Sequence, residues 1–281
     1  MRFRERVYIT LTALSVVVIV GLLGFILFDI VKNGISVINW EFLTQPPKEG
    51  MTKGGIFPAI YGTIVRVLLM LIFVVPTGIF TAVYLNEYGR GSKFSRWIRI
   101  AINNLSGVPS IVFGLFGMGF FVIFLRLGAG LLSAALTVGI LTLPVVVTST
   151  EEALKSVPNS YREAAFALGA TKWQVIRTVV LPQSLPGILT GAILSVGRAA
   201  GEVAPLLFTG VAYYLPYLPT SIYDQFMDLG YHIYIMTTQS FDVDATRPIQ
   251  YGSTLVLLML TFLLNLVAIF IRSKIRRRSI R

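Results

Sequence analysis

Residues 195–205, SVGRAAGEVAP, place Arg198 and Glu202 in the middle of an apolar run that extends from Pro186 to about Gly210. Such a run can cross a lipid bilayer, because a spanning helix needs about 20 predominantly apolar residues. A charged side chain at the centre of the bilayer is costly, so it normally faces a bundle interior or a water-filled cavity. The stretch therefore predicts a membrane-spanning helix that lines something polar.

The composition of the chain also indicates a membrane protein. Hydrophobic residues make up 55% of the 281 residues, and charged residues only 13%. An ordinary soluble domain carries about 25% charged residues, so this chain lacks the polar side chains that a water-facing surface requires. Most of its surface is therefore expected to face lipid.

The apolar stretches predict an all-α protein with six transmembrane helices in a single domain over residues 1–281. The stretch from Ile100 to Thr150 is long enough for two helices, with a turn at Arg126–Gly130. The first apolar core exceeds the 7–15 residues or so of a signal peptide, so we expect a retained helix. The spans are predicted at about 7–31, 56–86, 101–125, 130–150, 185–210 and 250–271, with a polar loop at 151–184.

Basic residues predict the orientation of these spans. With both termini in the cytoplasm, 17 of the 24 Lys and Arg residues fall in cytoplasmic segments. Cytoplasmic loops carry an excess of basic residues, so this orientation is expected. The net charge of +11 is then a topology signal, and nucleic-acid binding is not needed to explain it.

The sequence lacks the residues that disulfides, metal sites and nucleotide-binding sites commonly require. It has no cysteine, and its single histidine, His232, is expected on the surface of an outer loop, so no metal site is predicted. The Gly-Lys dipeptide of a nucleotide-binding P-loop is also missing. We therefore expect no catalytic residue, no cofactor and no ATPase site in this chain. If ATP and Mg are used, another subunit binds them.

The polar segment Ser149–Pro186 predicts two short helices. The first begins at Pro158 and ends at Gly169, because glycine adopts the left-handed conformation after a helix at low cost. Thr171 caps the second helix, which Pro182 closes. The segment is either an amphipathic hairpin on the membrane surface or a helix that docks into a partner's groove. The two apolar faces hold Tyr161, Ala164, Ala165 and Leu168, and Trp173, Ile176 and Val180.

This segment resembles the EAA loop of ABC importer permeases. Glu163-Ala-Ala165 is followed by Gly169 and then by Val179-x-Leu181-Pro182, where the family has Ile at the position of Val179. The resemblance implies a coupling helix that inserts into a cleft of a cytoplasmic ATPase. The residues expected to couple the ATPase are Glu163, Ala164, Ala165, Gly169, Leu181 and Pro182.

Two further stretches resemble the permeases of phosphate importers. They are LSGVPSIVFGLFGMG at Leu105–Gly119 and GRAAGEVAPLLFTG at Gly197–Gly210, and the second is closer to the PstA type than to the PstC type. The resemblance implies the fold of a type I ABC importer permease in the bacterial cytoplasmic (inner) membrane. It also implies a PstC-like permease, a PstB-like ATPase dimer and an extracytoplasmic PstS-like phosphate-binding protein as partners.

Arg198 and Glu202 are expected on one helix face because they are four residues apart. Arg198 lies roughly 18 Å along the helix from Pro186, near the bilayer midplane. One interpretation is a simple buried ion pair. In the other, the guanidinium fork of Arg198 meets a tetrahedral oxyanion in transit. Glu202 would then hold Arg198 and accept a hydrogen bond from protonated phosphate, which sulfate cannot donate.

Arg66 and Ser110 complete the predicted substrate path. Arg66 lies in the second span and offers a second positive charge, unless its long side chain reaches the outer interface. Ser110 offers a hydroxyl in the third span, unless it bonds back to its own backbone.

These features predict the transmembrane permease subunit of an ATP-driven phosphate importer, which forms half of the path and couples it to a separate ATPase. The alternative is a permease for another oxyanion, such as phosphonate, sulfate or molybdate. A secondary transporter often shows an inverted repeat, which this sequence lacks. A membrane-anchored scaffold would have little reason to place charges at the midplane.

Overall fold

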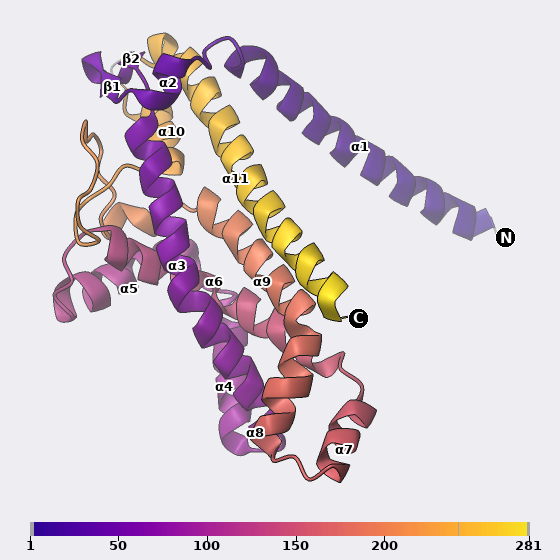
Figure 1. Ribbon diagram of the computed structural model, residues 1–281. Coiled ribbons are helices and arrows are strands. Elements are labelled where there is room, and N and C mark those ends of the chain that lie inside the picture. The colour runs from indigo at the N-terminus through magenta and orange to yellow at the C-terminus, as the bar shows by residue number, and fades with distance from the viewer. Residues whose placement is uncertain (1–2, 241, 280–281) are drawn as a thin grey trace.

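The computed structural model describes residues 3–240 and 242–279, which are mostly helical (Figure 1). Five helical segments are long and apolar enough to cross a membrane, and a bent helix pair raises the number to six. The all-α class predicted from the sequence is confirmed, and the five to six candidate spans agree with the six predicted. The helices of these segments are α1 (Phe3–Gly34), α3 (Phe57–Val83), the bent pair α4 (Lys93–Leu105) and α5 (Ser110–Gly117), α6 (Leu131–Lys155), α9 (Leu181–Gly201) and α11 (Val243–Ser279).

Shorter elements gather at the two ends of the molecule (Figure 1). One end holds α2 (Trp40–Thr44), α10 (Leu229–Thr238) and a small antiparallel hairpin, in which β1 (Pro47–Lys48) pairs with β2 (Lys53–Gly54) around the 3-10 turn Glu49–Met51. The opposite end holds α4, α7 (Asn159–Ala167) and α8 (Lys172–Val175). The remaining elements are the π turns Tyr84–Tyr88, Met118–Phe124 and Ile176–Val180, and the 3-10 turn Leu206–Phe208.

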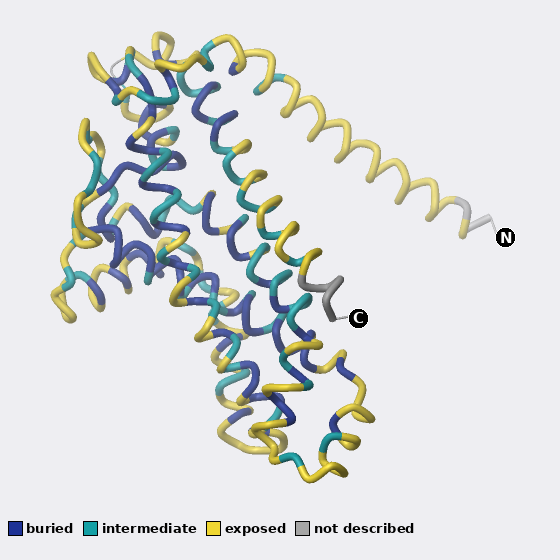
Figure 2. The backbone as a smooth tube through the Cα atoms, viewed as in Figure 1, coloured by how far each residue is buried: buried dark blue, intermediate teal, exposed yellow. Residues whose placement is uncertain are grey.

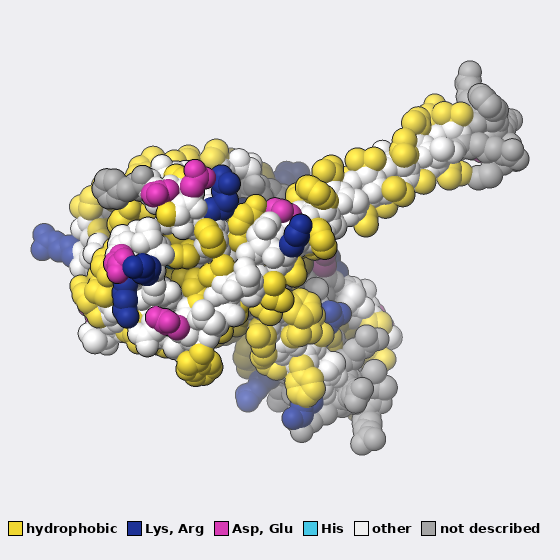
Figure 3. All heavy atoms as spheres, turned by 90° about the horizontal axis from the view of Figure 1, so that it is seen from above, with side chains coloured by type: hydrophobic (Ala, Val, Ile, Leu, Met, Phe, Trp, Pro, Cys, Tyr) yellow, Lys and Arg dark blue, Asp and Glu magenta, His cyan; other side chains and the backbone are white. Residues whose placement is uncertain are grey.

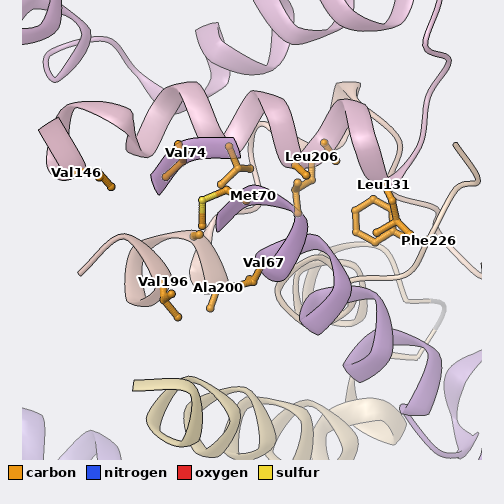
Figure 4. Packing of buried hydrophobic residues seen from close by; sticks show 13 residues of the cluster. Val67, Met70, Val74, Leu131, Val146, Val196, Ala200, Leu206 and Phe226 are labelled. Carbon is orange, nitrogen blue, oxygen red and sulfur yellow. The ribbon is translucent and has the colours of Figure 1, made fainter. Parts of the chain in front are cut away.

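The hydrophobic core lies between α3, α6 and α9. Small residues let these helices approach closely: a side chain at Gly78 of α3 would collide with Val146 of α6, and one at Gly191 of α9 with Ser149. Membrane helices associate through such close packing, because lipid supplies no hydrophobic force between them. The core fixes the position of α9 and therefore of its charged end. The residues that meet here include Val67, Met70, Val74, Val146 and Val196 (Figure 4).

Helix α1 stands apart from this core (Figures 1 and 2). Most of its apolar side chains are exposed, and hydrophobic side chains cover much of the face of the helix that is seen from above (Figure 3). It meets α11 near its C-terminal end, where the Tyr251 hydroxyl donates a hydrogen bond to Asp29 at 2.9 Å. A helix that is apolar all round suits burial in lipid.

The predicted span at 101–125 is not one straight helix. Helices α4 and α5 meet at an angle of 110° across residues 106–109. Pro109 has no N–H to continue the helical ladder, and it disfavours helical backbone at the preceding Val108. Beyond the bend, α5 packs against α6 and against the segment that follows α9, where a side chain at Gly114 would collide with Phe208.

The helices of the polar loop start and end largely as predicted. Gly169, which follows the C-cap residue Leu168 of α7, has a φ of 81°, and Thr171 caps α8 in a reciprocal capping box with Gln174. The prediction that Pro182 closes the second helix is wrong, because α8, the π turn Ile176–Val180 and α9 form one continuous helix. In a π turn the hydrogen bonds span five residues instead of four. This local change of hydrogen bonding comes just before Pro182, which has no N–H, and the helix continues past it.

Candidate functional site

The end of α9 carries the predicted pair of charged residues. Arg198 lies in the last turn of the helix with its side chain 42% exposed, while the Glu202 side chain is 16% exposed. The Arg198 Nε lies 3.3 Å from Glu202 Oε1. The predicted pairing is therefore present. Within the described residues, Glu202 binds the Nε and leaves both terminal nitrogens of the guanidinium without a partner.

Glu202 itself lies beyond the helix, contrary to the predicted span at 185–210. Helix α9 ends at Gly201, and Glu202 has extended backbone (φ −75°, ψ 129°). Pro205 has no N–H to offer to the Gly201 carbonyl, so the ladder cannot continue at this point. The pair thus bridges the end of a helix rather than one helix face.

The chain continues from Glu202 as an irregular segment that packs within the protein. Leu206 and Thr209 are buried, and the 3-10 turn Leu206–Phe208 lies against α5. Non-helical backbone at membrane depth occurs only where it is buried in protein or lines a water-filled cavity. A cation near a helix C-terminus is also favoured by the helix dipole. The broken helix end is therefore suited to line a polar path.

Arg66 is fully buried in an ion pair that was not predicted from the sequence. Its Nη2 lies 2.8 Å and its Nε 2.9 Å from Asp228 Oδ2. Its Nη1 donates to the Ala199 carbonyl at 2.9 Å, next to Arg198. The side chain does not extend to an interface, and Asp228 compensates its charge in this conformation. A direct role of Arg66 in the path remains a prediction.

Asp228 joins three parts of the fold through this network. It accepts a hydrogen bond from Thr63 of α3 at 3.1 Å and caps α10 by accepting from the Gly230 N–H. Arg66 links the same carboxylate to the last turn of α9. The sequence contained one signal for this pair. Arg66 lies in a predicted span that has no acidic residue, and a buried charge requires a partner, so an acidic residue from elsewhere in the chain could have been expected.

Ser110 begins α5 directly after Pro109 and is partly buried. Its hydroxyl makes no hydrogen bond to any described residue, so the alternative bond back to its own helix is not formed. Neither is it bonded to Arg198 or Glu202. Its role in the path also remains a prediction.

The coupling segment presents much of its predicted apolar face to the outside. Glu163, Ala164 and Pro182 are exposed, Ala165 and Leu181 are half-buried, and Leu168 is 90% exposed. Two ion pairs attach the segment to the preceding part of the chain. They are Arg162–Glu87 at 3.0 Å and Arg99–Glu151 at 2.8 Å. The hairpin is thus anchored on one side and open on the other.

His232 is not a surface residue, contrary to expectation. It lies in α10, is buried, and neither ring nitrogen has a partner among the described residues. Desolvation lowers the pKa of His232 to about 4, which favours the neutral ring. No group of three His, Cys, Asp or Glu residues that could hold a metal ion occurs in 3–240 or 242–279.

Known proteins with similar sequences are membrane components of transporters. Residues 74–281 match the family model described as binding-protein-dependent transport system inner membrane component. The chain is 34% identical over 281 residues to phosphate transport system permease protein PstA 1 of Mycobacterium tuberculosis, covering 99% of this chain and 91% of that protein. It is 32% identical over 277 residues to probable ABC transporter permease protein YqgI of Bacillus subtilis, covering 95% and 92%.

Solved transporters share the fold. A bacterial ABC transporter for import of the acidic polysaccharide alginate matches with a TM-score of 0.68 and 15% identity over 96% of each chain. The inward-facing MetNI methionine ABC transporter matches with a TM-score of 0.60 and 20% identity over 79% of this chain and 94% of that one. The predicted ABC importer permease fold and the multi-pass inner-membrane location are confirmed. Because the family model covers most of the chain, and relatives align over nearly all of it, the chain belongs to the family of binding-protein-dependent transport system inner membrane components.

Proposed function

We propose that this chain is a transmembrane permease subunit of an ATP-driven phosphate importer. The observation that carries the proposal is the partly exposed Arg198 at the broken end of α9, with Glu202 on its Nε. A guanidinium with both terminal nitrogens free can bind a tetrahedral oxyanion through two parallel hydrogen bonds. Relatives named as phosphate transport system permeases support phosphate as that anion.

Glu202 gives the site a preference for a protonated anion. A carboxylate next to a path repels an anion unless the anion donates a hydrogen bond. Phosphate keeps at least one O–H near neutral pH, whereas sulfate and molybdate keep none. Glu202 therefore has two roles in the proposal: it orients Arg198, and it accepts the O–H of phosphate.

The chain would work with separate partners that supply energy and substrate. A second permease would complete the path, an ATPase dimer would use ATP and Mg, and an extracytoplasmic binding protein would deliver phosphate. The exposed face of α7 suits an ATPase contact. A solved alginate transporter of the same fold, with a TM-score of 0.64, is in complex with a substrate-bound periplasmic protein. The chain itself performs no covalent chemistry in this proposal.

The proposal is tested by reconstituting the assembled transporter in proteoliposomes. Uptake of radiolabelled phosphate should require ATP and should resist competition by excess sulfate, molybdate or phosphonate. Faster uptake of one of these anions would identify a permease for another oxyanion. Phosphate uptake without ATP would indicate a secondary transporter instead.

The Glu202→Gln variant tests the preference for a protonated anion. Glutamine removes the negative charge and adds an amide donor, so the repulsion of fully deprotonated anions is lost. We expect phosphate uptake to persist while excess sulfate becomes an effective competitor. The matched control is Glu41→Gln, an exposed substitution outside the path. Equal sulfate discrimination in Glu202→Gln and the wild type would remove Glu202 from this role.

Two substitutions test the proposed coupling segment. Gly169 has a left-handed backbone with open space around it, so Gly169→Val is penalised by the backbone conformation, at roughly 1–2 kcal/mol. Ala164→Trp, at an exposed position of α7, instead blocks close approach of a partner. We expect both variants to lose phosphate uptake and to release the ATPase from purified membranes, while Ser36→Trp, an exposed substitution between α1 and α2, keeps both. Retained ATPase and uptake in both variants would show that the hairpin is a surface connector.

A further inference from the structure

A hollow of about 390 Å³ lies where α4 begins, at the same end of the molecule as α7 and α8 (Figure 1). We call it the α4 hollow. No acidic residue lines it. Its charged lining residues are Arg90, Lys93, Arg96 and Arg99.

Two of these four side chains are held by a partner within the chain and two are not. Arg99 binds Glu151 at 2.8 Å, and the Arg90 Nε donates to the Asn86 carbonyl at 2.6 Å. The side chains of Lys93 and Arg96 make no hydrogen bond or ion pair with any described residue. The hollow therefore offers two cationic side chains without a partner, about one helical turn apart.

A buried hydroxyl in the same hollow also lacks a partner. Ser95 is 3% exposed, lines the α4 hollow, and its Oγ has no hydrogen-bond partner in the described chain. Buried polar side chains are normally paired, so an unpaired one at a ligand-sized hollow points to a missing acceptor. Gly89 lies against this Oγ, and a side chain there would collide with it.

The start of α4 adds oriented backbone donors. Ser92 caps the helix by accepting from the Phe94 N–H at 3.2 Å. The other N–H groups of a first helical turn have no intrahelical partner, and they favour an anion such as a phosphate group. Cations, hydroxyl and helix N-terminus thus converge on one anionic, multi-oxygen ligand.

We propose that the α4 hollow binds the phosphate group of an anionic ligand, separately from the transport path. The surroundings favour a phospholipid headgroup, because Phe94 and Trp97 on α4 are 63% and 71% exposed beside the basic residues. Aromatic and basic side chains together are typical of the membrane interface. The Lys172 Nζ lies 4.7 Å from the Tyr88 ring centroid, so the site adjoins the coupling hairpin. The proposal does not depend on which solute the chain transports.

Tryptophan fluorescence of the full chain in neutral detergent tests this site. Trp40→Phe and Trp173→Phe together leave Trp97 as the only tryptophan. Brominated phosphatidylglycerol should quench Trp97 at concentrations roughly 25-fold below those needed for brominated phosphatidylcholine, because each of the two side chains, Lys93 and Arg96, is expected to contribute a gain of about fivefold near an anionic headgroup. In this background, Lys93→Gln with Arg96→Gln should abolish the preference. Ser95→Ala should weaken it severalfold without changing charge.

The matched control is Lys155→Gln with Arg177→Gln, which removes the same charge from exposed positions outside the hollow. It should keep the preference. Inorganic phosphate is then titrated against the anionic lipid. If inorganic phosphate displaces the lipid, and the displacement depends on Lys93 and Arg96, the site recognises a phosphate group. A soluble phosphate compound could then occupy the hollow in place of the lipid. The proposal is overturned if the hollow and control variants behave alike, or if neither the anionic lipid nor phosphate binds.

Discussion

Replacing Arg198 by alanine is expected to reduce phosphate uptake by at least about 100-fold, because two charge-assisted hydrogen bonds are lost and each is worth roughly tenfold. Arg198 is partly exposed and packs at the helix end rather than in the core. The variant should therefore still fold and assemble with its partners. The measurement is ATP-dependent uptake in proteoliposomes with the amount of assembled complex determined in parallel.

Arg198→Lys separates geometry from charge. Lysine keeps the positive charge but presents a point-like ammonium in place of a planar fork. Uptake should therefore fall roughly tenfold, between the wild type and Arg198→Ala. Arg247→Ala is the control, because Arg247 lies in an exposed pair with Asp244 at the start of α11. Near wild-type uptake by Arg198→Ala would show that the path does not pass this residue.

Local signals in the sequence predicted much of this site. Gly169 and Thr171 have the predicted backbone roles because helix ends depend on one or two residues. The pairing of Arg198 with Glu202 was predicted from their spacing, although the helix ends between them. A spacing of four residues brings the two side chains together both in a continuous helix and across a helix end. It does not show at which residue the helical hydrogen bonds stop.

The features that were missed depend on contacts or angles that no local pattern contains. Pro109 marks a helix break in the sequence, but the angle of 110° is set by how α5 packs on α6 and on the end of α9. Pro182 indicates a helix end, yet the preceding π turn lets the helix continue. Arg66 and Asp228 are 162 residues apart, so only the tertiary fold brings the buried charge and its counter-charge together.

Replacing Asp228 by alanine is expected to have the largest effect on stability. It leaves the Arg66 guanidinium buried without compensation, and breaking a buried ion pair in this way costs about 3–5 kcal/mol. It also removes the cap of α10 and one of the two acceptors of the Thr63 hydroxyl, the other being the Ala59 carbonyl. The variant should unfold at a markedly lower temperature in detergent, and less of it should reach the membrane.

A double substitution shows whether the pair only neutralises the buried charge of Arg66 or also positions the end of α9 next to Arg198. Arg66→Leu with Asp228→Leu removes both charges, and replacing a buried ion pair by apolar residues is often neutral or stabilising. We therefore expect the double variant to recover most of the unfolding temperature that Asp228→Ala loses. Because Arg66 also holds the Ala199 carbonyl next to Arg198, phosphate uptake should stay low in the recovered protein. Full recovery of uptake would mean that the pair only neutralises charge, and an unchanged unfolding temperature in Asp228→Ala would contradict the buried pair itself.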